Sequence, residues 1–323
     1  MTITGYSSDD HNFRVVVIGA GYMAQEHIRA FTDLAQIEIA GIYSRTREKA
    51  ETVAAQHGIT KVYDSIAELY IETQAHLVVI AVSELSVRAV CLEAFIYPWT
   101  CLIEKPAGYD LADAEAIVQA ARDKGQTAYV ALNRRHYGST RAVLEALENS
   151  DSQRLVHVYD QEDPDAAIKA GRPADVVRNW MYANSIHIID YLRMFCRGEI
   201  VAVEPVVAWQ PDEPRFVLAK VSFSSGDIGI YEAIWNGPGP WAVTVTTQEK
   251  LCEMRPLEQV SFQNYGSRTL DALPEQPWDI EFKPGLRLQA EEALKIMKGL
   301  PSMMPTLDDA LQTMKLVRDI YDL

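Results

Sequence analysis

The stretch Val15-Val-Val-Ile-Gly-Ala-Gly-Tyr-Met-Ala24 joins an apolar run to a glycine turn and the start of a helical pattern. The β-branched run predicts a buried strand, and the residues after the turn predict a helix. Gly19 permits a tight turn, Gly21 lets the backbone approach a pyrophosphate, and Ala24 takes the place of a third glycine where helix packs on strand. Because amides at a helix N-terminus attract phosphates, the stretch predicts a dinucleotide-binding turn. A glycine turn that binds no ligand is the alternative.

The first 130 residues repeat this alternation of strand and helix. Further strands are expected at 37–43, 77–82, 100–103 and 127–132, with helices at 47–57, 66–71, 87–95 and 111–124. The run at 77–82 is apolar throughout, as expected for a parallel strand that is buried on both faces. The pattern therefore predicts an α/β fold that begins with a Rossmann doubly wound parallel sheet.

The pattern changes after residue 134. A polar loop is expected at 161–177, several strand-like runs separated by turns fill residues 200–262, and helical patterns occupy 139–148, 185–196, 286–298 and 307–321. This half is predicted to be an α+β domain built on a largely antiparallel open sheet. Because 323 residues exceed one typical core, we expect two domains. Residues 1–131 would form an NAD(P)-binding Rossmann domain, and residues 132–323 a substrate and oligomerisation domain.

Composition limits the classes of partner. Lys and Arg number 30 against 45 Asp and Glu, and a net charge of −15 argues against nucleic-acid or anionic-membrane binding. No apolar run approaches the ~20 residues of a membrane span, and residues 1–12 are expected to be a loose tail without a secretory signal. The four cysteines show no paired spacing. We therefore expect a cytoplasmic protein with reduced thiols, no metal site and a small polar substrate.

The end of the second predicted strand indicates which dinucleotide is bound. A site selective for NAD has a carboxylate about 20 residues after the glycine turn, to hold the ribose 2′-hydroxyl. This chain has Ser44-Arg45-Thr46 there. An arginine can bind a 2′-phosphate, with the two hydroxyls as further donors. The sequence favours NADP over NAD; a solvated arginine at a strand end is the alternative.

Lys105 lies in the string Thr100-Cys-Leu-Ile-Glu-Lys-Pro106, at the end of a predicted strand. Pro106 restricts Lys105 to extended geometry, which fixes its direction. A lysine that acts as an acid near neutral pH needs its pKa lowered from about 10.4, by burial or a nearby positive charge. Glu104 is either a strand-end carboxylate or a partner that tunes the lysine. A surface lysine without a chemical role is the alternative for Lys105.

The second candidate for proton chemistry is His187, in the predicted helix at 185–196. Helical spacing places His187 on one face with Ala183 and Asp190, and Asp190 could hold its ring in one tautomer. Considered alone, a histidine in this position is more often structural than catalytic.

The order of these motifs resembles the Gfo/Idh/MocA oxidoreductases, named for glucose–fructose oxidoreductase and inositol dehydrogenase. The shared elements are the glycine turn, Glu-Lys-Pro, Asn133-Arg-Arg135 and the helical His187-x-x-Asp190. The resemblance implies that Lys105 handles the substrate hydroxyl proton and that His187 shares this work. It also implies a cleft between a Rossmann domain and a C-terminal domain whose open sheet forms homodimer or homotetramer contacts.

The expected cofactor contacts follow from the glycine turn, the second strand and the resemblance. They are Gly19, Gly21, Tyr22, Met23, Ser44, Arg45, Thr46, Ala81, Val82, Ser83, Glu84, Glu104, Lys105 and Arg134. Two positions depart from the family pattern. Ala183 stands where its dehydrogenases usually carry an aspartate, and Val82-Ser-Glu84 replaces Thr-Pro-Asn. Three explanations remain open: lysine and histidine suffice, Asn184 replaces the aspartate, or redox activity is lost.

The substrate is expected beside Lys105, Arg178, Trp180 and His187, with Arg172 and Tyr182 nearby in sequence. Arginine and aromatic side chains suit a polar ring that bears phosphate or carboxylate, such as a nucleotide sugar; an ordinary surface loop is the alternative. The segment Trp235-Asn-Gly-Pro-Gly-Pro-Trp241 is interpreted as a sheet turn with packing aromatics.

These features together predict an NADP-dependent oxidoreductase. It would transfer a hydride between the nicotinamide and a secondary alcohol or ketone of a sugar-like substrate, such as a nucleotide sugar or a cyclitol. Two alternatives are a glycosidase or lyase of the same fold that retains its cofactor, and a non-catalytic NADP-binding sensor.

Overall fold

Six parallel strands form the sheet of the N-terminal half. They are β1 (Phe13–Ile18), β2 (Ile37–Tyr43), β3 (Val62–Tyr63), β4 (Leu77–Ile80), β5 (Thr100–Glu104) and β6 (Ala128–Ala131). The computed structural model describes residues 13–323, so the expected tail at 1–12 lies outside the described residues. The strand order is β3-β2-β1-β4-β5-β6 and every pairing is parallel. The predicted Rossmann doubly wound sheet is confirmed, with its reversal of order between β1 and β4.

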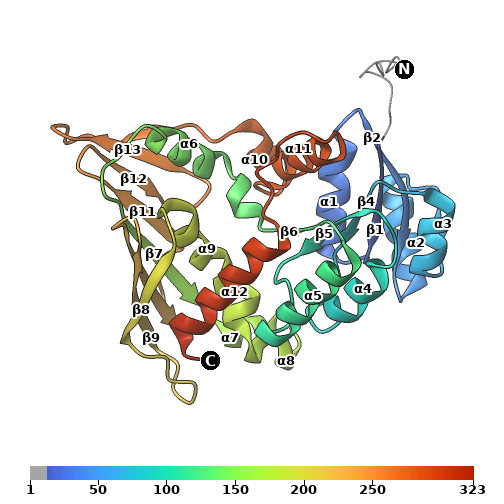
Figure 1. The fold of residues 1–323 in the computed structure, drawn as a ribbon, viewed down its shortest axis with the longest axis horizontal. Coiled ribbons are helices and arrows are strands. Elements are labelled where there is room, and N and C mark those ends of the chain that lie inside the picture. Colours follow the sequence, from blue (N-terminus) through green and yellow to red (C-terminus); the bar gives the residue numbers. More distant parts are fainter. Residues whose placement is uncertain (1–12) are drawn as a thin grey trace.

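Helices connect these strands and cover the sheet (Figure 1). Because successive strand residues point to opposite faces, β1 contributes to two apolar clusters. Val15 and Val17 pack with Ile28 and Phe31, whereas Val16 belongs to the cluster on the other face. The helices are α1 (Tyr22–Thr32), α2 (Arg47–His57), α3 (Ile66–Thr73), α4 (Val87–Ala94) and α5 (Leu111–Lys124).

The second half is built on an eight-stranded sheet, seen on the left in Figure 1. Its strands are β7 (Leu155–Glu162), β8 (Ile200–Val207), β9 (Phe216–Phe223), β10 (Ile228–Trp235), β11 (Ala242–Thr246), β12 (Lys250–Met254), β13 (Val260–Asn264) and β14 (Asp271–Leu273). The order is β14-β13-β12-β11-β7-β10-β9-β8. Only the β7–β10 pairing of these described strands is parallel, so the prediction of a largely antiparallel sheet is confirmed.

The described α-helices of this half are α6 (Gly138–Leu147), α7 (Pro164–Lys169), α8 (Ala174–Arg178), α9 (Ile186–Phe195), α10 (Pro277–Glu281), α11 (Leu286–Met297) and α12 (Leu307–Tyr321). Three of them, α7, α8 and α10, were not predicted from the sequence. A polar loop was expected where α7 and α8 lie. A local cap explains α7: the Asp163 side chain accepts a hydrogen bond from the Ala166 N–H, and Pro164 occupies the first turn.

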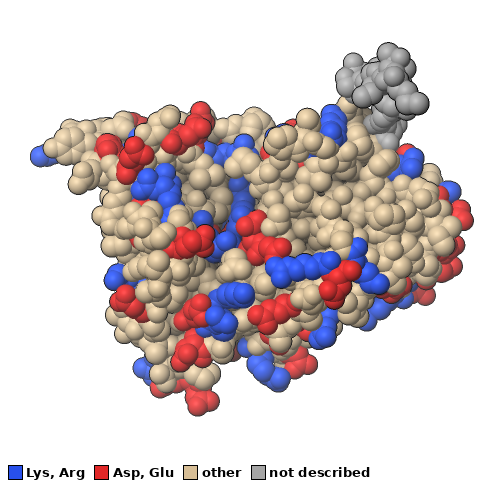
Figure 2. Space-filling view, viewed as in Figure 1, with Lys and Arg blue, Asp and Glu red and all other residues tan. Residues whose placement is uncertain are grey.

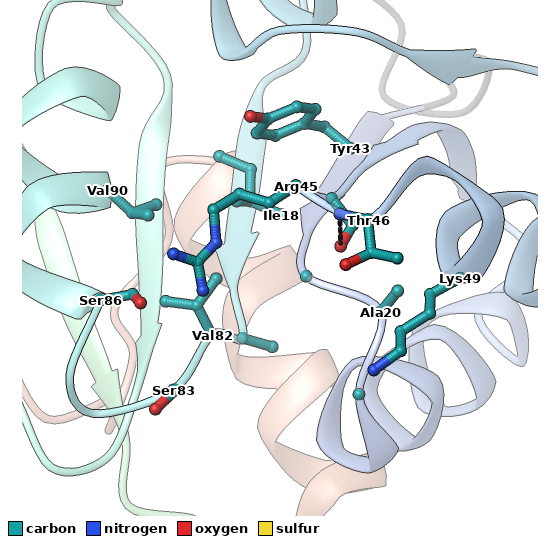
Figure 3. Close-up of a pocket in the computed structure, with 14 residues that line it drawn as sticks. Ile18, Ala20, Tyr43, Arg45, Thr46, Lys49, Val82, Ser83, Ser86 and Val90 are labelled. Carbon is teal, nitrogen blue, oxygen red and sulfur yellow. Dashed lines mark hydrogen bonds between the residues drawn. The ribbon is translucent and has the colours of Figure 1, made fainter.

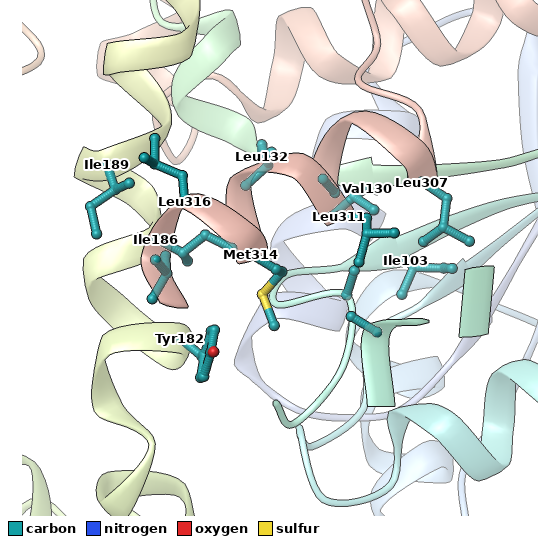
Figure 4. Close-up of a cluster of buried hydrophobic side chains, with 14 of the residues drawn as sticks. Ile103, Val130, Leu132, Tyr182, Ile186, Ile189, Leu307, Leu311, Met314 and Leu316 are labelled. Carbon is teal, nitrogen blue, oxygen red and sulfur yellow. The ribbon is translucent and has the colours of Figure 1, made fainter. Parts of the chain in front are cut away.

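The last two helices return to the Rossmann sheet. In α11, Leu286 and Ala290 pack in the same cluster as Ile28 of α1. In α12, Leu311 and Met314 lie between the ends of β5 and β6 on one side and α9 on the other (Figure 4). The two halves thus share one apolar core across the chain, and the boundary at 131/132 stays a prediction.

Two further features of the molecule are its charged surface and its cysteine thiols. Acidic and basic side chains are interspersed over the face seen in Figure 2. All four cysteines are free and buried, and burial raises the thiol pKa of Cys196 to about 12. Within residues 13–323 no helix is both long and apolar enough to cross a membrane.

Candidate active site

A pocket lies against the glycine turn, at the carboxyl ends of β1, β2 and β4 (Figure 3). Gly19 has φ +116°, and a Cβ there would approach the Ala81 main-chain oxygen to 2.0 Å, so only glycine fits. A Cβ on Gly21 would meet nothing within 4 Å, which leaves open space in front of α1. The lining residues are Ile18, Gly19, Ala20, Gly21, Tyr43, Ser44, Arg45, Thr46, Lys49, Ala81, Val82, Ser83, Ser86 and Val90.

The pocket brings together eight of the residues expected to contact the cofactor: Gly19, Gly21, Ser44, Arg45, Thr46, Ala81, Val82 and Ser83. Tyr22, Met23, Glu84, Glu104, Lys105 and Arg134 do not line it. Lys49 is an addition, and it lies in the first turn of the helix that follows Ser44-Arg-Thr46. Its closeness to the end of the second strand could have identified Lys49 as a cofactor contact from the sequence.

The charged side chains that line this pocket are cationic. In Figure 3 the Arg45 guanidinium extends into the pocket, and Lys49 approaches from the side of α2. Arg47, by contrast, is paired with Glu51 at 2.8 Å and with Asp64. None of the described residues that line the pocket carries a carboxylate. The two cationic side chains can bind a phosphate group.

Glu104 is buried at the end of β5 and pairs with a histidine of α1. Its Oε1 lies 2.7 Å from His27 Nε2, and its Oε2 accepts a hydrogen bond from the Lys105 main-chain N–H. Its negative charge also opposes loss of the Lys105 proton. Glu104 is therefore both a strand-end carboxylate and a partner of the lysine. His27 was not foreseen, because its partner is 77 residues away.

The Lys105 side chain is held by the main chain of the other half. Its Nζ donates to the carbonyl oxygen of Ala183 at 2.7 Å. Burial lowers the pKa of Lys105, opposed by Glu104 and Glu84 and assisted by the positive charges of Arg134 and Arg172. The Lys105–Pro106 peptide bond is cis.

Ala183 belongs to a π-helical turn, Met181–Ser185, that leads into α9. The carboxyl group of Glu162, at the end of β7, binds two side chains of this turn and the side chain of Trp180, which precedes it. It accepts hydrogen bonds from Trp180 Nε1 at 2.5 Å, Asn184 Nδ2 at 2.8 Å and Ser185 Oγ at 3.1 Å. Burial and the adjacent Asp160 carboxyl raise the pKa of Glu162 well above its usual range. Glu162 thus fixes the turn, and the turn presents the Ala183 carbonyl to Lys105.

His187 lies in the first turn of α9 and is held neutral. Burial lowers its pKa well below 6.5, and the charges of Arg134, Lys105 and Lys283 lower it further. Its Nδ1 is buried and has no hydrogen-bond partner among residues 13–323. The expected contact with Asp190 is absent there, because that carboxylate binds the Arg135 guanidinium at 2.6 and 2.7 Å.

Comparison with known proteins bears on the family of the N-terminal half and on the fold. The family model described as "Oxidoreductase family, NAD-binding Rossmann fold" (GFO_IDH_MocA) matches residues 13–132. Residues 13–132 carry the Rossmann domain of the Gfo/Idh/MocA oxidoreductase family. The predicted resemblance is confirmed.

Three curated relatives show how far the similarity extends. D-apiose dehydrogenase of Paraburkholderia graminis is 28% identical over 137 residues, 42% of this chain and 36% of that protein. UDP-N-acetylglucosamine 3-dehydrogenase of Acidithiobacillus ferrooxidans is 29% identical over 114 residues, 35% of this chain and 34% of that protein. The chain therefore spans 36% and 34% of the length of these two relatives. A third, 4-carboxy-2-hydroxymuconate-6-semialdehyde dehydrogenase of a Sphingobium strain, is 23% identical over 70% of this chain and 73% of that protein.

The likeness of fold extends over the whole chain. The solved structure of the Acidithiobacillus enzyme aligns with a TM-score of 0.78 at 18% identity, covering 96% of both chains. Both halves of the protein therefore share their fold with that structure.

A second pocket lies next to the π-helical turn. It is lined by Gln161, Glu162, Asp163, Ala166, Ala167, Ala170, Arg172, Trp180, Asn184, Gly239 and Trp241. Trp180 was expected near the substrate, but Arg178 does not line this pocket and lies 3.4 Å from Asp175. Tyr182 is buried under α12 (Figure 4), where burial raises its pKa to about 12.

Trp241 corrects the interpretation of 235–241 as a turn of packing aromatics alone. Trp235 does pack, against Trp209 and Tyr321. Trp241 instead lines the second pocket, and the Arg134 guanidinium lies 4.0 Å from its ring centroid. The two residues are over 100 positions apart in sequence, so no local pattern connects them.

Proposed function

We propose that this protein is an NADP-dependent dehydrogenase or reductase acting on a secondary alcohol or ketone of a sugar-like substrate. The observation that carries the proposal is the hydrogen bond from Lys105 Nζ to the Ala183 carbonyl, near a His187 whose pKa is lowered by burial and next to Asn184, which lines the second pocket. When bound, NADP supplies or accepts the hydride at the substrate carbon. The names of the relatives, D-apiose and UDP-N-acetylglucosamine dehydrogenases, support a sugar substrate.

The chain's own residues would hold the cofactor and move the proton. Arg45 and Lys49 suit the 2′-phosphate, and the open space before Gly21 suits the pyrophosphate. In the oxidation direction the hydroxyl proton passes to Lys105, whose pKa is lowered by burial, as a C=O bond replaces the C–O single bond. Neutral His187 accepts a hydrogen bond from the same hydroxyl or relays its proton.

The proposal also covers where the protein is located and how its subunits assemble. A cytoplasmic enzyme with free buried thiols fits the composition. In β9 and β10 every second residue is buried, while most of the alternate residues are half-exposed or exposed. That outer face supports a homodimer or homotetramer formed through the C-terminal sheet.

A single assay tests the proposal and its alternatives. Purified protein would be incubated with NADP+ or NAD+ and a panel of sugars and nucleotide sugars, following the absorbance of the reduced nicotinamide and the products. Net reduction indicates a dehydrogenase, and a lower KM for NADP+ than for NAD+ supports the NADP assignment. Product without net reduction indicates a glycosidase or lyase that retains its cofactor.

The missing carboxylate at Ala183 favours a second candidate, a non-catalytic NADP-binding sensor. Tight NADPH binding with no product from any sugar in the panel would support the sensor and contradict the dehydrogenase.

A further inference from the structure

We propose that the second pocket binds a sugar ring carrying an anionic group, with the ring on Trp241 and the anion on Arg172. This inference rests on the proposed function and narrows its substrate class. The cavity measures about 550 Å³, which lies within the range of pockets that hold small molecules.

The pocket adjoins the groups that would carry the proton. Asn184 lines it and directly follows Ala183, whose carbonyl binds Lys105 Nζ. Arg172 also lines it, and its charge lies near enough to lower the pKa of Lys105. A ring seated in this cavity can therefore place a hydroxyl beside Lys105 while it contacts Arg172.

Two tryptophans form rigid walls. Trp241 Nε1 donates to the Gln161 carbonyl at 2.8 Å, and Trp180 Nε1 donates to Glu162 at 2.5 Å. Because both indole N–H groups are bound to the end of β7, the rings are fixed and offer flat apolar surface to the pocket. The Arg134 guanidinium contacts the Trp241 ring and supports it. Such a surface suits the C–H face of a sugar ring.

The acids in the pocket are already engaged. Glu162 accepts from three donors, and Asp163 caps α7 through the Ala166 N–H at 2.8 Å. Neither carboxylate lies within ion-pair distance of Arg172, which is exposed and forms no ion pair with any residue from 13 to 323. An unpaired guanidinium in a protein of net charge −15 suits a carboxylate or phosphate, which it can bind with two parallel hydrogen bonds.

Isothermal titration calorimetry of the NADP+-bound protein tests the inference with D-glucuronate, D-glucose 6-phosphate and D-glucose. At least one acidic sugar should bind about tenfold or more tightly than glucose, since hydrogen bonds to charged groups are the stronger ones. Preference for glucuronate identifies a carboxylate, and preference for the phosphate ester identifies a phosphate. Arg172→Gln should remove the preference.

Arg178→Gln is the matched control, because Arg178 lies six positions away and outside the pocket. It should leave the preference intact, and thermal melting should show that both variants are folded. Equal binding of all three sugars, no binding of either acidic sugar, or an equal effect of both variants would overturn the inference.

Failure of the proposed function can be distinguished from failure of the subsite assignment. Acid-selective binding without oxidation of any sugar contradicts the dehydrogenase and leaves the subsite assignment standing. Equal oxidation of neutral and acidic sugars, unaffected by Arg172→Gln, supports the dehydrogenase and contradicts the subsite assignment.

Discussion

The Nζ atom of Lys105 lies 2.7 Å from the main-chain carbonyl oxygen of Ala183. A carbonyl offers only a partial negative charge, so it orients the ammonium group without stabilising the cation as a carboxylate would. Burial can then lower the pKa of Lys105 with less opposition. The backbone of Ala183 thus orients Lys105 at the position where the family pattern usually has an aspartate.

Replacing Lys105 with Met should abolish turnover and leave NADPH binding nearly unchanged. Removing a general acid or base costs about 10²–10⁴-fold in rate, and Lys105 does not line the cofactor pocket. Steady-state kinetics and calorimetric titration with NADPH measure the two effects. Lys49→Met is the converse control: it should weaken NADPH binding, because Lys49 lines that pocket. Normal turnover in the Lys105 variant would refute its assignment.

Ala183→Asp should move the acidic limb of the kcat/KM profile to higher pH. A carboxylate beside Lys105 favours its charged form and raises its pKa by about one unit or more, so the neutral amine appears only at higher pH. Ala183→Asn adds similar volume without charge and should leave the limb in place. An unmoved limb in the Asp variant would show that another group controls the profile.

Much of the Rossmann half could be predicted because its signals are local. Apolar runs marked β1 and β4, and the glycine turn marked the start of α1. Gly19 was predicted for a tight turn, and the structure adds the close approach of the Ala81 oxygen. Adjacent residues carry all of this information.

The site between the halves was harder to predict because distant segments form it. Glu162 meets Asn184 from 22 positions away, and Trp241 meets Arg134 across more than 100. The π-helical turn has no pattern of its own, because it depends on the anchorage of its side chains by Glu162. Sequence could therefore name Lys105 and His187, but not the residues that hold them.

Arg45→Ala should raise KM for NADPH about tenfold or more and leave KM for NADH nearly unchanged. The guanidinium would bind only the 2′-phosphate, and hydrogen bonds to charged groups contribute about 1.5–3 kcal/mol. Arg47→Ala is the control, since Arg47 is occupied by Glu51 and Asp64. Equal losses with both cofactors would assign Arg45 to adenine or pyrophosphate instead.

Glu162→Gln should lower kcat and destabilise the protein. An amide NH2 in place of one oxygen would face the donors Trp180 and Asn184, leaving buried groups unpaired at a cost of about 1–3 kcal/mol. Because the π-helical turn would loosen, Lys105 would lose its orientation while KM for NADPH stays constant. Urea unfolding and kinetics measure both effects. Glu232→Gln, on an exposed position of β10, should change neither.

His136 should make stability depend on pH below about 6.5. It is fully buried, neither ring nitrogen has a hydrogen-bond partner in the described chain, and burial lowers its pKa to about 3. The unfolded chain binds this proton first as the pH falls, so the contribution of His136 is complete above its unfolded pKa and declines from about 6.5 towards 3, by up to about 1.4 kcal/mol per pH unit.

Urea unfolding between pH 7.5 and 4.5 measures this slope. His136→Phe should reduce it by the share of one proton, because the ring no longer titrates. His57→Asn, at the end of α2, should retain the wild-type slope since His57 is only partly buried. Identical slopes in wild type and His136→Phe would mean that the acid sensitivity arises from carboxylates whose folded pKa is lowered, such as Asp190, where Arg135 outweighs the effect of burial, and not from this histidine.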